Sequence, residues 1–114
     1  MAVGSNLEMR LEVYPDGTLA PSLVTGISQL LARRWPGHWD VKTPSSPTLD
    51  HPAEWRAVIP LPDGATPESL HKSIESEILA LDFNHQLHLR TRWAFAESPN
   101  HQEVYEVRWA SQPR

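Results

Sequence analysis

Two segments of this 114-residue chain repeat one pattern at an offset of 47 positions. One Pro-Asp-Gly triplet begins at Pro15 and a second begins at Pro62. The apolar positions that follow keep the same offset, so that Leu23 matches Leu70, Ile27 matches Ile74 and Leu31 matches Ile78. Each copy is predicted to fold as a strand, a turn, a helix and a strand. The repeat therefore indicates a duplicated βαβ unit.

Apolar periodicity places the expected elements along the chain. Strands are expected over about 7–14, 38–43, 54–61, 87–95 and 103–109, and helices over about 21–35 and 66–81. Thr66 suits the N-cap of the second helix, and Pro67 suits its first turn. This order resembles the ferredoxin-like architecture, an α+β two-layer sandwich of βαββαβ order, with a fifth strand added at the C-terminus. The resemblance implies sheet order 5-4-1-3-2, both helices on one face, and a single domain over 1–114, ordered from about 6 to 110.

The last two strands are predicted to form a hairpin whose turn lies at 97–100. A register that places Arg92 opposite Glu106 pairs opposite charges across the strands. The alternation along 54–61, 87–95 and 103–109 places four aromatic residues on the core side of the sheet, namely Trp55, Trp93, Tyr105 and Trp109. His71, on the second helix, is expected to be exposed.

Composition excludes several classes of protein. The net charge of −4 argues against a general binder of the phosphate backbone. The chain contains no cysteine, so disulfides and thiolate ligands are excluded. No apolar run is long enough for a transmembrane helix, and the first residues lack the pattern of a signal peptide. An acidic, cytoplasmic protein that does not enter a membrane is expected.

The sheet face that the helices leave uncovered is predicted to be charged, with Arg10 among its residues on the first strand. Four arginines on this face are candidates for contact with a partner: Arg56, Arg90, Arg92 and Arg108. The predicted face is almost free of aromatic residues, whereas the RNA-binding sheets of RRM domains stack bases on exposed aromatic side chains. This difference argues against nucleic-acid binding.

A second candidate site lies at one end of the predicted sheet, where three connecting segments meet. It comprises Asp16, Asp50, His51, Asn84 and His85. An Asp and a His within hydrogen-bond reach can act as an acid–base pair. The chain offers no cysteine and no nucleophile-elbow motif, so no catalytic residue is assigned. His85 and His88 lack a third ligand at metal-binding spacing, and neither a metal nor a cofactor is expected.

Three functional hypotheses follow from these patterns. The first is a small non-catalytic protein that binds another protein, as an adaptor, a regulator, or a phage-encoded or immunity-type factor. The second is a small enzyme with a pocket between sheet and helices, lined by Trp39, Trp55, Trp93 and Phe95. The third is nucleic-acid binding. The sequence names no partner, and a monomer or a weak homodimer is expected.

Overall fold

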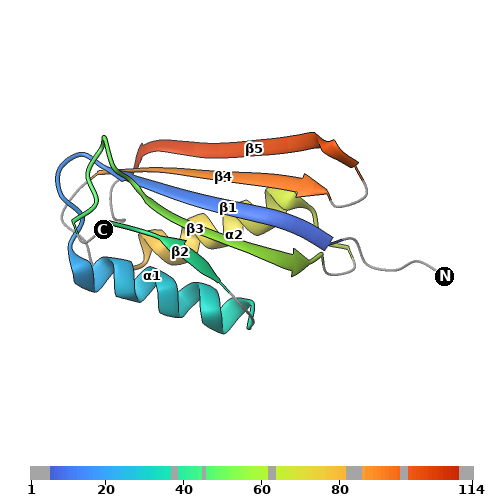
Figure 1. Cartoon of the computed structure of the whole chain (residues 1–114), viewed down its shortest axis with the longest axis horizontal. Helices are drawn as coiled ribbons and strands as arrows, with labels where there is room; N and C mark the ends of the chain where they lie inside the picture. The colour runs from blue at the N-terminus through green and yellow to red at the C-terminus, as the bar shows by residue number, and fades with distance from the viewer. Residues whose placement is uncertain are drawn as a thin grey trace.

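The chain forms one five-stranded sheet and two helices in the part that the computed structural model describes, which is residues 6–36, 39–44, 46–61, 64–81, 86–95 and 98–110 (Figure 1). The elements in chain order are β1 (Asn6–Pro15), α1 (Pro21–Arg34), β2 (Asp40–Lys42), β3 (Ala53–Pro60), α2 (Pro67–Leu79), β4 (Leu87–Phe95) and β5 (Ser98–Ala110). All neighbouring strands are antiparallel, in the order β2-β3-β1-β4-β5. This order confirms the predicted one.

Alternate residues of the central strand β1 point to opposite faces of the sheet. Its apolar residues Leu7, Met9, Leu11 and Val13 are all fully buried and join one core cluster with the buried residues of both helices. The residues between them point to the opposite side. One face of the sheet is therefore packed, and we call the other the open face.

The repeat found in the sequence corresponds to equivalent core positions of the two helices. Leu23, Ile27 and Leu31 of α1 are buried, and so are their counterparts Leu70, Ile74 and Ile78 of α2. Thr66 is the N-cap of α2, as predicted, and its side chain accepts a hydrogen bond from the Ser69 backbone amide at 3.1 Å. The Ser69 hydroxyl in return accepts from the Thr66 backbone amide. Such reciprocal capping stabilises the first turn of a helix.

The predicted register of β4 and β5 is wrong by two residues. Glu106 lies opposite Arg90 rather than Arg92, whose partner is Val104. β5 also begins at Ser98, inside the segment that was assigned to the turn. The register is irregular near both ends of the pair, between Ala94 and Phe95 and between Leu87 and Leu89. The charge pairing in the sequence fits both registers, because Arg90 and Arg92 share one face.

A bulge near the end of β5 places Trp109 on the open face. Leu89 pairs with Val107 and Leu87 pairs with Ala110, so two residues of β5 lie opposite His88. Trp109 has a φ of 54°, in the left-handed region, and its side chain is 39% exposed. The prediction that Trp109 lies in the core is wrong, because a bulge re-aims the side chains that follow it. Trp55 and Trp93 are fully buried, as predicted.

The prediction that His71 is exposed is also wrong. His71 is 5% exposed under the sheet, where Nδ1 is 2.8 Å from the Thr91 hydroxyl and the ring lies 5.7 Å from that of Tyr105. Histidine carries an apolar body with a polar tip, so it enters a core when its ring nitrogens find partners. Among the described residues, neither helix has the length and apolar character needed to cross a membrane.

Candidate functional site

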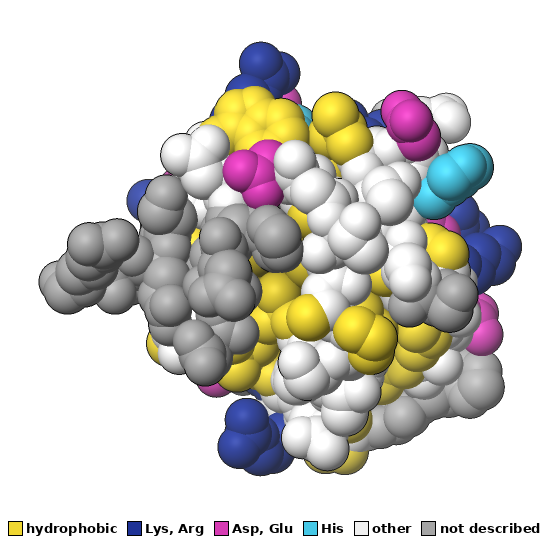
Figure 2. Space-filling model, turned by 90° about the vertical axis from the view of Figure 1, so that its left-hand side faces the viewer, with side chains coloured by type: hydrophobic (Ala, Val, Ile, Leu, Met, Phe, Trp, Pro, Cys, Tyr) yellow, Lys and Arg dark blue, Asp and Glu magenta, His cyan; other side chains and the backbone are white. Residues whose placement is uncertain are grey.

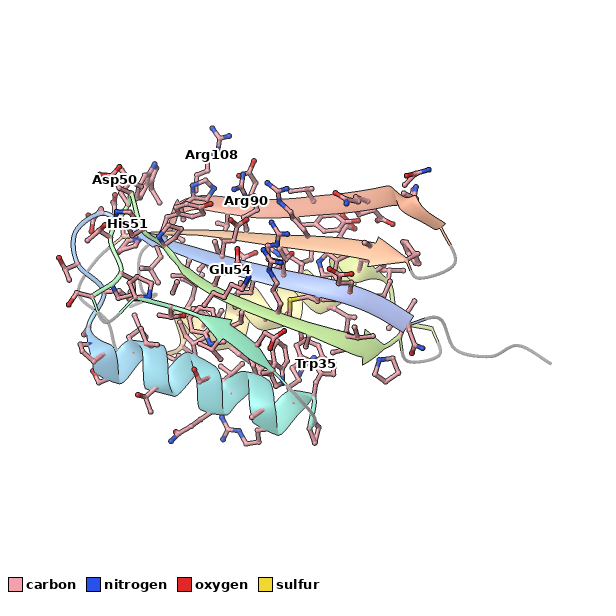
Figure 3. All side chains as sticks on the ribbon, viewed as in Figure 1. Trp35, Asp50, His51, Glu54, Arg90 and Arg108 are labelled. Carbon is pink, nitrogen blue, oxygen red and sulfur yellow. The ribbon has the colours of Figure 1, made fainter. Side chains whose placement is uncertain are left out.

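The open face is a grid of side chains, most of them charged, supplied by all five strands (Figure 3). Cross-strand partners share a face, so the register assigns the side chains to this grid. Its described members include Glu8, Arg10, Glu12 and Tyr14 of β1, Glu54, Arg56 and Val58 of β3, His88, Arg90, Arg92 and Ala94 of β4, and Gln102, Val104, Glu106 and Arg108 of β5, with Asp40 and Lys42 on β2.

Three arginines lie side by side across the middle of this grid. Arg10 on β1 is the direct partner of Arg56 on β3 and of Arg92 on β4. We call this set the arginine row. Like charges directly opposite each other on neighbouring strands destabilise a sheet. The row therefore lowers the stability of the fold unless anions offset its charge.

Glu12 is the first of two carboxylates that offset this charge. It lies two residues after Arg10 on β1, on the same face of the sheet, and is 7% exposed. Its Oε1 is 3.0 Å from Arg90 Nε and 3.7 Å from Arg92 Nε, and its Oε2 accepts from the Tyr14 hydroxyl at 2.9 Å. Burial alone would raise the pKa of Glu12, but the hydrogen bonds from Arg90 and Tyr14 and the two positive charges leave that pKa below its ordinary value. Glu12 is therefore ionised at neutral pH.

Glu54 plays the same part on the other side of β1. Its Oε2 accepts from Arg56 Nε at 2.8 Å, and its Oε1 lies 3.9 Å from Arg10 Nε. Each carboxylate thus has one close guanidinium and one distant one. The close partners are Arg90 and Arg56, and the distant partners are Arg92 and Arg10.

An aromatic corner, made of Tyr14, His88 and Trp109, adjoins this grid at one end. The ring of His88 lies 5.3 Å from that of Tyr14 and 6.0 Å from that of Trp109. His88 Nε2 is 2.7 Å from Glu106 Oε2, and this hydrogen bond holds the pKa of Glu106 below its ordinary value. Arg90 lies over the Tyr14 ring at 5.5 Å. The corner joins the charged grid through Arg90.

Within the described part of the chain, two hollows lie on the open face, on either side of Glu8. The smaller, of about 50 Å³, is lined by Glu8, Arg10, Arg92, Ala94 and Gln102. The larger, of about 370 Å³, is lined by Glu8, Asp40, Arg56, Ala57 and Val58. The arginine row contributes to both hollows, so an occupant of either one meets a guanidinium group.

The end-of-sheet site predicted from the sequence is described only in part. The Asp16 amide donates to the Gln86 carbonyl at 3.1 Å, and the Leu19 amide donates to the Pro47 carbonyl at 2.8 Å. These bonds place the three connecting segments at one end of the sheet. Figure 2 shows this end of the molecule, where hydrophobic, basic, acidic and histidine side chains reach the surface.

Asp50 and His51 are both exposed in a turn closed by Thr48. The His51 amide donates to the Thr48 carbonyl at 3.2 Å, and the Thr48 amide donates to the His51 carbonyl at 2.9 Å. Asn84 and His85 lie outside the described residues. A binding role for this end of the sheet stays a prediction.

The four arginines predicted for the sheet face all lie on it. Arg90 and Arg92 face Glu12, Arg56 faces Glu54, and Arg108 Nη2 is 3.4 Å from Glu106 Oε1. The sequence reasoning counted Arg10 as a face residue but missed its place between two other arginines, because that requires the register of three strands. It also missed His88 and Trp109, and only a known bulge could have placed Trp109 here.

The described residues contain no group of three His, Cys, Asp or Glu side chains that could hold a metal ion. Neither a protein-family model nor a curated protein nor a solved structure matches the chain. The function is therefore argued from the geometry of the open face. That geometry offers guanidinium groups, aromatic rings and exposed apolar side chains on one surface.

Proposed function

We propose that this protein is a non-catalytic binding protein that docks another protein on its open face. The observation that carries the proposal is the arginine row. Three guanidinium groups lie in register although their mutual repulsion opposes folding. A partner that brings carboxylates to this face gains charge-assisted hydrogen bonds, which are the strong kind.

The composition of the open face supports the same proposal. The described face carries six basic and five acidic side chains, whereas the whole chain has a net charge of −4. Arginine, tyrosine and tryptophan, which dominate binding energy at protein interfaces, all occur on it. Three large apolar residues are also exposed there, namely Val58, Val104 and Trp109. This mixture is typical of an interface between separately folding proteins.

The alternative of an enzyme pocket between sheet and helices draws less support. Trp55 and Trp93 are fully buried, and their indole N–H groups donate to the hydroxyls of Ser28 and Thr91 at 2.9 and 2.8 Å. These bonds suit structural core residues. Both hollows described above open on the other side of the sheet.

Nucleic-acid binding remains a further alternative, and the aromatic corner favours it more than the sequence did. Stacked bases need exposed ring faces beside cations. Trp109 supplies one such face, while Tyr14 is covered by Arg90 and His88 is turned toward Glu106. A nucleic acid would bring a phosphate group at every nucleotide against Glu8, Glu12 and Glu54, whereas a protein partner needs to bring only a single carboxylate. We therefore favour a protein partner.

The proposal also includes the finer architecture and location. The order of elements supports a ferredoxin-like arrangement with β5 added to one edge. That arrangement leaves one sheet face free of helices, as a docking role requires. A cytoplasmic location, and a monomer or weak homodimer before the partner binds, stay part of the proposal.

Selection from a random displayed-peptide library on the immobilised full chain tests this function without knowledge of the host. The open-face variant carries Arg10→Gln and Arg92→Gln. The matched control carries Arg33→Gln and Lys72→Gln, which remove two exposed charges from the helices. Recovered peptides should bind the control as they bind the wild type and bind the open-face variant about tenfold more weakly. Equal binding to both variants, or no enrichment, would contradict docking on this face.

A further inference from the structure

Arg10 and Arg92 are the two members of the arginine row that make no hydrogen bond within the described residues. Glu54 and Glu12 make their close contacts, 2.8 and 3.0 Å, with Arg56 and Arg90. Arg10 and Arg92 reach the same carboxylates only at 3.9 and 3.7 Å, which exceeds hydrogen-bond length. Among the described residues, Arg92 Nε has no hydrogen-bond partner although it is shielded from solvent.

These two arginines border the smaller hollow together. They are direct cross-strand partners, and Gln102 of β5 completes the rim with a side-chain amide. A volume of about 50 Å³ admits a small group such as a carboxylate. Two guanidinium forks and an amide N–H are the donors that a carboxylate needs, and the two positive charges outweigh the single negative charge of Glu8, which also lines this hollow.

The larger hollow offers different chemistry on the other side of Glu8. Val58 is 68% exposed beside it, and Ala57 contributes to its lining. An aliphatic side chain placed there would cover Val58. The carboxylate of Glu8 can accept hydrogen bonds from the backbone N–H groups of a bound chain.

The spacing of the two hollows limits what can fill both. They lie on either side of β1, and neighbouring strands are about 4.8 Å apart, so the hollows are separated by roughly 5–10 Å. In an extended chain, side chains two residues apart are on one side and about 7 Å apart. One extended segment can therefore reach both hollows.

We infer that the two hollows form a two-part site for an extended segment of the partner, with an acidic residue followed or preceded, two positions away, by an aliphatic residue. The carboxylate binds between Arg10 and Arg92, and the aliphatic side chain covers Val58. This inference rests on the proposed function and names the chemistry of the partner.

The test is an NMR titration of the ¹⁵N-labelled full chain with the blocked pentapeptide Gly-Glu-Ala-Leu-Gly. Binding with a dissociation constant on the order of 1 mM is expected for so short and flexible a ligand. The largest shifts should occur at the amides of Arg10, Val58 and Arg92 and at the Arg92 side-chain N–H. Replacing the peptide's Glu by Gln should weaken binding about tenfold, because the charge-assisted bonds are lost.

Two protein variants and one reordered peptide test the two parts of the site separately. Arg92→Lys keeps the charge but removes the fork, so it should weaken binding of the Glu peptide and leave the Gln peptide unchanged. Val58→Thr keeps the shape of the side chain and should weaken binding of the Glu peptide and of the Gln peptide alike, because both contain the Leu residue. The reordered peptide Gly-Glu-Leu-Ala-Gly should bind more weakly, because its side chains point to opposite sides.

Several outcomes would overturn the inference. The first is equal affinity for the Glu and Gln peptides. The second is an affinity for acetate alone that equals the affinity for the Glu peptide. The third is a set of NMR shifts centred on Asp50 or Trp109. The proposed function can survive that failure. If display selection yields peptides that need Arg10 and Arg92 but lack the acidic and aliphatic pair, docking stands and this two-part site is wrong.

Discussion

Neighbouring residues of β4 build two polar networks on opposite faces of one sheet. On the packed face, the Thr91 hydroxyl accepts from Trp93 Nε1 and lies 2.8 Å from His71 Nδ1, while His71 Nε2 is 3.3 Å from Glu75. On the open face, Arg90 and Arg92 converge on Glu12. The first network lies under α2, and the second faces solvent.

The two networks differ in how many donors each acceptor must satisfy. In the packed network the Thr91 hydroxyl accepts from Trp93 Nε1, and it can donate to His71 Nδ1 when the neutral imidazole carries its proton on Nε2, toward Glu75. Every buried polar group then has a partner, as core networks require. In the open network two carboxylates serve four guanidinium groups. The comparison shows which face has N–H donors available to a partner. Unpaired donors cost little free energy only where solvent or a ligand can reach them.

Replacing the two tryptophans of these faces is expected to give the largest contrast. Trp93→Ala should lower the free energy of unfolding by about 3–5 kcal/mol, because it removes a fully buried aromatic side chain. Trp109→Ala should lower it by less than about 1 kcal/mol, since exposed positions tolerate truncation. Urea denaturation measures both values. Similar losses for the two variants would contradict the placement of Trp109 on the open face.

The central carboxylate gives the next largest effect. Glu12→Gln should lower the free energy of unfolding by about 1.5–3 kcal/mol, because a buried acceptor of charged hydrogen bonds loses its charge. The control Glu106→Gln, in a more exposed pair, should change it by about 0–1 kcal/mol.

The same two variants can be compared as a function of pH. Because the pKa of Glu12 is lowered in the folded state, its stabilisation is complete above pH 4.5, its ordinary value, and declines as pH falls further. Glu12→Gln should therefore show a weaker loss of stability below pH 4.5 than the wild type. Parallel pH profiles would show that Glu12 is not held ionised by its arginines.

The core positions follow from the sequence for a local reason, whereas the sheet order is implied by the resemblance of the duplicated unit to a known architecture. Alternation along β1 and the matched apolar stripes of the two helices are each decided by residues close together in the chain. The position of Thr66 at an N-cap follows from the same local chemistry. These features need no information about how distant strands align.

The register of β5 and the burial of His71 do not follow from local pattern. A slip of two residues keeps every side chain on its face, so alternation cannot distinguish the observed register from the predicted one. The bulge then reverses the facing of the residues after Arg108, beginning with Trp109. The arginine row depends on two registers at once, so sequence periodicity identified its members but not their contact.

His71 provides a smaller, pH-dependent effect on the packed face. Burial lowers the pKa of His71, although Glu75 opposes the shift. The unfolded chain then binds a proton more readily than the folded one, so stability should decline as pH falls below 6.5, the ordinary value. The decline due to one proton cannot exceed about 1.4 kcal/mol per pH unit. His71→Asn should reduce the slope of the free energy of unfolding between pH 6.5 and 5, whereas His101→Asn, at an exposed position, serves as the control. Equal slopes for wild type and His71→Asn would contradict the buried neutral imidazole.

The smallest effect tests the backbone conformation at the bulge. It is a reversal of the usual stability order of alanine and glycine at one position, not a large loss of stability. At an ordinary strand position, glycine is less stable than alanine by about 0.5–1 kcal/mol. Trp109 has a φ of 54°, where a residue with a Cβ is strained by about 1–2 kcal/mol and glycine is not. Both Trp109→Gly and Trp109→Ala remove the same indole contacts with His88, so their difference isolates the backbone. Trp109→Gly should therefore equal or exceed Trp109→Ala in free energy of unfolding, by up to about 1 kcal/mol. If alanine is the more stable by the ordinary margin, β5 runs without this bulge and Trp109 returns to the packed face, which would remove the aromatic corner from the docking surface.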